Sequence, residues 1–296
     1  MERPNILVIT TDQQSHDMMS CAGNGRLHTP AMDRIAAMGT RFERAYCANP
    51  ICVPSRFSMW TGRMPSAIGF SANRTAPEGP LPEEVHEGSL GHLVRSAGYD
   101  TFFAGKRHTP SGLTAESMGF TNLSWDRRDT MAVRAAEFLR TSRDRPWFLA
   151  VNFINPHDIC LMAIRQFPES DLLRGFLEHA HSDRTLAELD RALERPEGVS
   201  EQEFFDRHCP PLPPNHEVVE EEPAAFAPLL EDLPSRPAVR KNWGEREWRL
   251  HRWAYHRLTE RVDRQIGVLL DALGLSGQAE DTVIIFTIDY GDLDGA

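Results

Sequence analysis

Residues 5–13 of the chain, Asn-Ile-Leu-Val-Ile-Thr-Thr-Asp-Gln, combine an apolar run with polar residues directly after it. Their apolar part, residues 6–9, shows no alternation of apolar and polar side chains, which is typical of a strand covered on both faces. Polar residues follow at once. Three further segments have the same form, at residues 101–104, 147–153 and 282–287. The sequence therefore predicts four buried strands.

Helical patterns lie between these strands. Thr29 and Pro30 are typical of the start of a helix, and Gly39 of its end. Apolar residues recur at helical spacing over residues 90–97 and again over 258–273. Strands that alternate with helices predict an α/β fold, with a mostly parallel sheet and helices on both of its faces.

In such a sheet, ligands bind beyond the carboxyl ends of the strands. The polar residues that follow the predicted strands include Asp12, Lys106, His157 and Asp289. Each of them, taken singly, also fits a structural role: a strand-end aspartate as a helix cap or turn residue, the lysine as a solvated loop residue, and the histidine in a turn. Only their common position at the sheet edge predicts a functional site.

The composition excludes several classes of protein. The chain has 296 residues, of which 41% are hydrophobic and 25% charged, as in globular proteins. Its net charge of −11 argues against a general nucleic-acid binder, although a local basic cluster could still bind a small anion. Its five cysteines form no disulfide pattern. The apolar run at residues 6–9 is too short for a signal peptide or a membrane span, so we expect a cytoplasmic protein with no membrane partner.

The stretch at about residues 196–242 differs from the rest of the chain. It contains the proline-rich run 210–214 and the acidic run 220–222. We expect a surface excursion here rather than a separate domain, within a single domain that comprises residues 1–296.

The most specific local segment is residues 52–56, Cys-Val-Pro-Ser-Arg, which Thr-Gly-Arg follows at 61–63. Most free cysteines are small core residues, and composition alone favours that reading of Cys52. The proline and serine favour another, because they suit the first turn of a helix and would place Cys52 at the positive end of the helix dipole. Arg56, four residues on, could then contact the same anionic group.

This segment resembles the signature of the type I sulfatases, in particular arylsulfatase A-like members, which belong to the alkaline phosphatase superfamily. Other segments resemble further family motifs in the same order: residues 5–13, 105–108, 155–158 and 287–291. The resemblance spans nearly the whole chain.

The resemblance implies a sulfuric ester hydrolase that cleaves an aryl or carbohydrate sulfate. In the family, a formylglycine-generating enzyme oxidises the cysteine, here Cys52, to formylglycine. One hydroxyl of the hydrated aldehyde attacks sulfur and expels the alcohol. The second hydroxyl is then deprotonated, and sulfate is eliminated as the aldehyde returns. This is covalent catalysis assisted by a divalent cation.

The resemblance also implies a role for each site residue. The implied metal ligands are Asp12, Gln13, the modified Cys52, Asp289 and Tyr290. Because these residues would bind through oxygen atoms, the implied cation is Ca²⁺ rather than Mg²⁺. Arg56 would hold the formylglycine hydroxyl and the sulfate. The anion pocket would comprise Lys106, His108 and His157, with one histidine transferring a proton.

Three features depart from the family pattern. Gln13 stands where many relatives have aspartate, and Tyr290 where they have histidine or asparagine. The chain also ends soon after the last motif, so we expect the C-terminal subdomain to be missing and the strand at 282–287 to expose an edge. Two alternatives stay open: a phosphonate monoester or phosphodiester hydrolase of the same superfamily, and a catalytically inactive truncated remnant.

Overall fold

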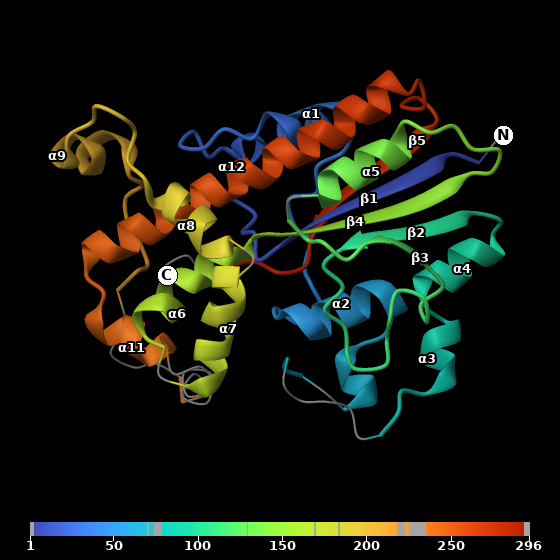
Figure 1. Ribbon diagram of the computed structural model, residues 1–296, viewed down its shortest axis with the longest axis horizontal. Helices are drawn as coiled ribbons and strands as arrows, with labels where there is room; N and C mark the ends of the chain where they lie inside the picture. The colour runs from blue at the N-terminus through green and yellow to red at the C-terminus, as the bar shows by residue number, and fades with distance from the viewer. Residues whose placement is uncertain are drawn as a thin grey trace. The chain divides into compact units, whose positions relative to one another are not determined.

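The computed structural model describes residues 3–69, 71–73, 79–128, 130–168, 170–182, 184–217, 223–224 and 235–292 (Figure 1). The chain divides into two compact units. The first comprises residues 3–23, 29–155 and 261–292, and the second residues 24–28 and 156–260. The expected organisation as one domain stays a prediction. Much of the expected excursion, including the acidic run 220–222, lies outside the described residues.

The first unit is built on a five-stranded sheet. Its strands, in spatial order, are β3 (Thr121–Ser124), β2 (Asp100–Gly105), β4 (Trp147–Pro156), β1 (Asn5–Asp12) and β5 (Thr282–Ile288). Strand β5 pairs in parallel with β1, and both β3 and β4 pair in parallel with β2. All four predicted strands are confirmed, and the mostly parallel sheet is the predicted one. The sequence pattern missed β3, because three of its four residues are polar and none of them is fully buried.

One face of the sheet is covered by three helices. They are α1 (Pro30–Met38), α5 (Met131–Leu139) and the C-terminal part of α12 (Glu245–Leu275). Leu7, Leu149 and Val151 of the strands pack there with Ile266 and Leu269 of α12, all of them buried. This apolar contact holds the strands in place from one side.

The other face is covered by α2 (Cys52–Thr61), α3 (Glu83–Glu87) and α4 (Leu90–Ser96). Here Phe57 and Trp60 of α2 pack with Phe103 of β2, and the Trp60 and Phe103 rings meet edge to face with centroids 5.3 Å apart. Helices on both faces, as predicted, leave the carboxyl edge of the sheet for polar residues. The remaining short elements of this unit are the 3-10 helices Ser20–Ala22 and Pro65–Ile68.

The start of α1 is held differently from what the sequence indicates. Thr29 does occupy the position before the helix, but its hydroxyl accepts from the Ser20 amide at 2.9 Å and does not cap the helix. The buried carboxylate of Asp263, on α12, instead accepts from the amides of Ala31 and Met32 at 3.1 and 2.8 Å. A residue more than two hundred positions away therefore satisfies the free amides of this helix.

Strand β5 is the last strand in the order of the described sheet. Its side chains alternate: Ile284 and Phe286 pack on the core, whereas Val283 and Ile285 are 46% and 45% exposed. The expected exposed apolar strand is therefore present. Two large aliphatic side chains on a terminal strand thus form an exposed apolar surface.

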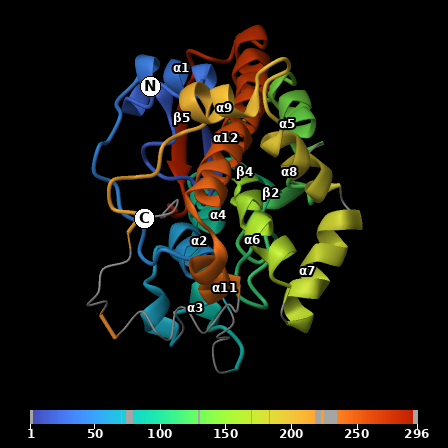
Figure 2. The same ribbon diagram turned by 90° about the vertical axis from the view of Figure 1, so that its left-hand side faces the viewer.

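The second unit is helical over its described part. Its elements are η3 (His157–Ile159), α6 (Cys160–Gln166), α7 (Asp171–Ser182), α8 (Thr185–Leu193), α9 (Glu201–Glu203), the π-helical turn Phe204–His208, α11 (Ser235–Asn242) and the N-terminal part of α12 (Figure 2). A small core forms around Phe204, Cys209 and Trp253. Within the described chain, no helix has the length and apolar character that a membrane crossing requires. The expected cytoplasmic location stays a prediction.

Candidate active site

Two aspartates meet where β1 and β5 end. The parallel register pairs Thr11 with Ile288, so Asp12 and Asp289 leave neighbouring strands at the same level. The Asp289 backbone amide donates to the Thr11 carbonyl at 3.2 Å, which continues the hydrogen bonding between β1 and β5 as far as the two aspartates. Both aspartates are fully buried. The two carboxylates separated by most of the sequence thus lie together, as predicted.

Cys52 is the first residue of α2, as the proline and serine after it predict. The helix is seated by the packing of Phe57 and Trp60 on the sheet, and this places the Cys52 thiol at the carboxyl edge. The sulfur donates to the Tyr290 hydroxyl at 3.3 Å and to Asp12 Oδ1 at 3.9 Å. A nucleophile made from Cys52 would therefore stand beside both strand ends.

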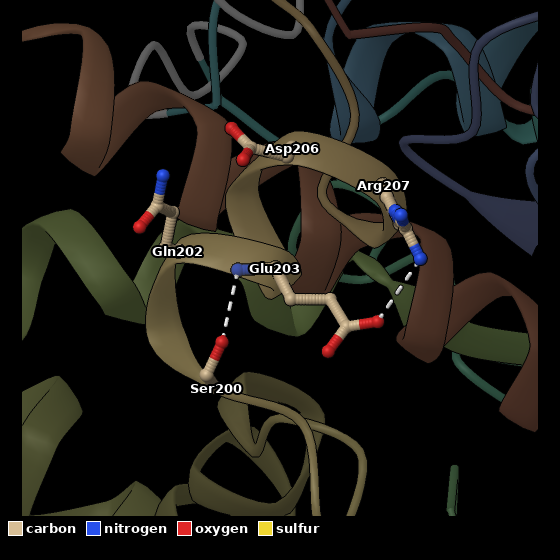
Figure 3. A pocket seen from close by; sticks show the side chains of 5 residues that line it. All are labelled: Ser200, Gln202, Glu203, Asp206 and Arg207. Carbon is tan, nitrogen blue, oxygen red and sulfur yellow. Dashed lines mark hydrogen bonds and ion pairs between the residues drawn. The ribbon is translucent and has the colours of Figure 1, made fainter.

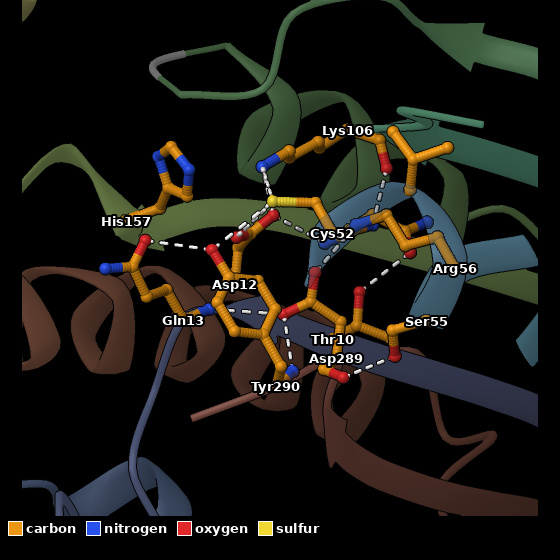
Figure 4. A network of polar contacts seen from close by, with 12 residues as sticks. Thr10, Asp12, Gln13, Cys52, Ser55, Arg56, Lys106, His157, Asp289 and Tyr290 are labelled. Carbon is orange, nitrogen blue, oxygen red and sulfur yellow. Dashed lines mark hydrogen bonds and ion pairs between the residues drawn. The ribbon is translucent and has the colours of Figure 1, made fainter. Parts of the chain in front are cut away.

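Arg56 lies one helical turn beyond Cys52 and is fully buried. Its guanidinium donates through Nε to Asp289 Oδ2 at 2.9 Å, through Nη2 to Asp12 Oδ2 at 3.0 Å, and through Nη1 to the Lys106 carbonyl at 2.8 Å. The Lys106 ammonium pairs with Asp12 and lies 3.9 Å from the Cys52 sulfur. Figure 4 shows these side chains gathered around the sulfur. Two cations and two carboxylates thus form one buried network.

The surroundings keep Arg56 charged. Burial alone would lower the pKa of its guanidinium, but the neighbouring Asp289 and Asp12 raise that pKa above its ordinary value. Burial raises the pKa of Asp289 to about 7, an effect that Arg56 opposes and the charge of Asp12 reinforces. Because each charge depends on its neighbours, removing one of them disturbs the whole network.

Gln13 and Tyr290 form a hydrogen-bonded pair beside the carboxylates. Gln13 has a left-handed backbone, with φ of 58°, and its backbone amide donates to Asp289 Oδ1 at 3.1 Å. The Tyr290 hydroxyl donates to Gln13 Oε1 at 2.9 Å. Burial, followed by the charges of Asp12 and Cys52, raises the pKa of Tyr290 well above its ordinary value, so the phenol is neutral.

The donor chemistry of this cluster fits a hard divalent cation. Carboxylate and amide oxygens, which Ca²⁺ prefers, come from Asp12, Asp289 and Gln13, all within the contact network around Cys52. The neutral phenol of Tyr290 is a weaker donor, and it occupies the Gln13 oxygen with a hydrogen bond. The predicted ligands are therefore brought together, and their oxygens already accept hydrogen bonds within this network.

The two predicted histidines lie differently. His108 follows Lys106 in the loop after β2, is exposed, and has a left-handed φ of 44°. None of the hydrogen bonds found among the described residues links it to the Cys52 network. His157 begins η3 directly after β4 and belongs to the second unit, where its Nδ1 lies 3.8 Å from the Cys160 sulfur. Proton transfer by either histidine stays a prediction.

The sequence reasoning missed several supporting residues. The Ser55 hydroxyl donates to the Asp289 carbonyl. Thr10, on β1, donates to Asn152 Oδ1 on β4 at 2.7 Å, and Asp292 accepts from the Gln13 side-chain amide. Ser55 lies within the 52–56 segment, three residues after Cys52, so helical spacing could have indicated it. Thr10, Asn152 and Asp292 carry no comparable signal.

A hollow lies in the second unit, lined by Ser200, Gln202, Glu203, Asp206 and Arg207 (Figure 3). Three of these residues bond to one another: the Ser200 hydroxyl caps the Glu203 amide, and Glu203 pairs with Arg207 at 3.3 Å. This hollow contains no buried charge and no candidate nucleophile, so the Cys52 network is the better candidate for a catalytic site.

The fold and the site define a class: an α/β protein with a cysteine at a helix start, facing an arginine, a lysine and paired strand-end carboxylates at the carboxyl edge of the sheet. Sequence comparison identifies the family. The sulfatase family model matches residues 4–293, and the chain belongs to the sulfatase family.

Individual relatives are distant. The chain is 26% identical to the uncharacterized sulfatase YidJ of Escherichia coli strain K12, over 100% of this chain and 59% of that protein. It is 25% identical to a delta 4,5-hexuronate-2-O-sulfatase of Bacteroides thetaiotaomicron, over 98% of this chain and 57% of that protein. The chain thus spans less than two thirds of these relatives. A solved 2-O GAG sulfatase shares the fold, with a TM-score of 0.70 and 23% identity over 99% of this chain and 59% of its own.

Proposed function

We propose that the protein is a sulfuric ester hydrolase whose nucleophile is a formylglycine made from Cys52 by a formylglycine-generating enzyme. The observation that carries this proposal is the position of Cys52 at the start of α2, beside Arg56, Lys106 and Asp12. A sulfate ester is an anion that repels nucleophiles, so cations must stand where it binds. This network supplies them, and membership of the sulfatase family supports the assignment.

The proposal assigns a role to each of the main side chains of the candidate active site. Lys106, whose ammonium contacts the Cys52 sulfur, neutralises the sulfate as it approaches. Arg56 is held by Asp12 and Asp289 and orients the nucleophile one helical turn away. Asp12, Asp289 and Gln13 would hold Ca²⁺, which acts as a Lewis acid when bound. His108 or His157 transfers a proton to the departing alcohol.

The proposed substrate is a carbohydrate sulfate. Two relatives with a stated activity on sugars support it, a delta 4,5-hexuronate-2-O-sulfatase and an N-acetylglucosamine-6-O-sulfatase, whereas a third relative is a choline-sulfatase. An aryl sulfate is the alternative substrate.

The proposal is tested on protein produced together with a formylglycine-generating enzyme. Intact-mass analysis should show conversion of the Cys52 thiol to an aldehyde, and ion chromatography should detect sulfate released from 4-nitrophenyl sulfate or glucosamine 6-sulfate. Turnover of an aryl phosphonate ester in preference to both would favour the phosphonate hydrolase. An unmodified thiol, together with a melting temperature that calcium does not raise, would support the inactive remnant.

Replacement of Tyr290 by asparagine is expected to strengthen calcium binding. The substitution removes the hydroxyl that occupies the Gln13 oxygen and adds a new amide oxygen. Because a net hydrogen bond contributes about 0.5–1.5 kcal/mol, we expect a roughly tenfold lower Kd. Isothermal titration calorimetry with calcium chloride measures the Kd directly and does not depend on turnover.

The matched control is Tyr46→Asn, because Tyr46 is an exposed tyrosine in the same unit. It should leave the calcium Kd within twofold of the parent. Equal Kd values for the parent and the Tyr290→Asn protein would show that the Tyr290–Gln13 hydrogen bond does not weaken calcium binding.

A further inference from the structure

Trp125 is an exposed aromatic residue that the Cys52 network does not use. It follows the last residue of β3, and 64% of its surface is accessible. Isolated apolar side chains are common on protein surfaces, but a tryptophan left this open forgoes the burial of a large apolar area. Its position at the carboxyl end of a strand is the part of the fold where ligands bind.

The register places this residue close to the candidate active site. Strand β3 runs parallel to β2, and Ser124 pairs with Ala104. Trp125 is the next residue on one strand, and Lys106 lies two residues on from Ala104 on the other. Trp125 and the sulfate-binding lysine therefore leave adjacent strands at nearly the same level.

The turn that carries Trp125 is anchored. The Asp126 carboxylate accepts from the Arg128 amide at 3.0 Å and from the Thr130 hydroxyl at 2.7 Å. The carbonyl of Arg127 accepts from the Ile154 amide of β4 at 3.4 Å, and that of Arg128 from Gln265 of α12 at 2.7 Å. A turn held in this way presents the indole ring without a large ordering cost on binding.

An arginine side chain lies near the Trp125 ring. The Arg107 guanidinium, next to Lys106, lies 6.0 Å from the centre of the Trp125 ring, at the outer limit of a cation–π contact. Its charge and its planar donors suit a carboxylate or a second sulfate. The pair thus offers an exposed apolar ring with an anion-binding group over it.

We propose that Trp125 and Arg107 form a subsite for a saccharide ring that carries a second anionic group, such as a uronate carboxylate or another sulfate. This inference rests on the proposed function, and it assigns the substrate class. The apolar face of a pyranose packs on the indole ring, while Arg107 pairs with the added anion. A substrate with a cationic alcohol is disfavoured, because Arg107 and Lys106 would repel it.

Binding is measured in the Cys52→Ala protein, so that the test does not depend on turnover. The probes are a disaccharide of a hexuronate and 6-O-sulfated glucosamine, and choline sulfate as a cationic ester. Calorimetry should show tighter binding of the disaccharide. Trp125→Ala and Arg107→Ala should each weaken that binding about tenfold, which corresponds to roughly 1.4 kcal/mol, whereas Trp125→Phe should retain most of it.

Arg145→Ala is the matched control. Arg145 is an exposed arginine that pairs with Asp100 at 3.1 Å, at the amino end of β2, so its removal should leave disaccharide binding unchanged. Tighter binding of choline sulfate, no binding of the disaccharide at millimolar concentration, or equal loss in the Arg145→Ala protein would each overturn the subsite. Retained disaccharide binding in a wild-type protein that releases no sulfate would overturn the proposed function alone.

Discussion

Cys52→Ala protein should release no measurable sulfate and should still fold. The substitution removes the atom from which the nucleophile is made, and loss of a nucleophile lowers turnover by about three orders of magnitude or more. The fold should persist because the packing of Phe57 and Trp60 on the sheet holds α2, whereas the sulfur's polar contacts with Tyr290, Asp12 and Lys106 are 3.3–3.9 Å long. The measurement is the initial rate of sulfate release, beside a thermal unfolding curve.

Cys47→Ala provides the matched control, because Cys47 is an exposed cysteine five residues before Cys52. It should retain the parent rate. Full turnover in the Cys52→Ala protein would show that the reaction does not use this residue. Loss of the unfolding transition would instead mean that Cys52 supports the fold more than its contacts indicate.

Arg56→Met should destabilise the protein strongly. The substitution leaves the buried carboxylates of Asp12 and Asp289 without the guanidinium that pairs with both. Removal of one partner from a buried ion pair costs about 3–5 kcal/mol, because the remaining charge stays desolvated. Urea unfolding should show this loss in the free energy of unfolding, and sulfate release should disappear as well.

Two further variants test whether the loss of stability in Arg56→Met comes from the burial of the charges or only from the loss of an ion pair. Arg34→Ala breaks an exposed ion pair with Asp271 at 2.8 Å, and it should cost no more than about 1 kcal/mol. The double variant Arg56→Met/Asp289→Asn should be more stable than Arg56→Met, because it removes the Asp289 charge that has lost its guanidinium, while Lys106 still pairs with Asp12. A loss in Arg56→Met no larger than that in Arg34→Ala would contradict a buried charge network.

Much of the fold could be predicted because most of its strands are rich in apolar residues. The segments at 6–9, 101–104, 147–153 and 282–287 are predominantly apolar, and each of them forms a strand. Strand β3 escaped prediction because three of its four residues are polar and none of them is fully buried, so that its sequence lacks an apolar run.

The candidate site could be predicted in part for a different reason. Residues at 12, 52–56, 106 and 289 stand in short motifs at strand ends or at a helix start, where local sequence determines the geometry. The contacts that link them could not be predicted. The bond from Tyr290 to Gln13 joins residues far apart in the chain, and only the register of β5 on β1 brings them together.

Local patterns of polarity and short motifs were sufficient for the family, for four of the five strands and for the identity of the side chains at the strand ends. The tertiary structure was needed to show the pairing of Arg56 with two carboxylates, the capping of α1 by Asp263, and the exposure of Trp125 next to Arg107. Such pairings depend on distances between residues that lie far apart along the chain, and those distances exist only after the sheet and its helices have packed.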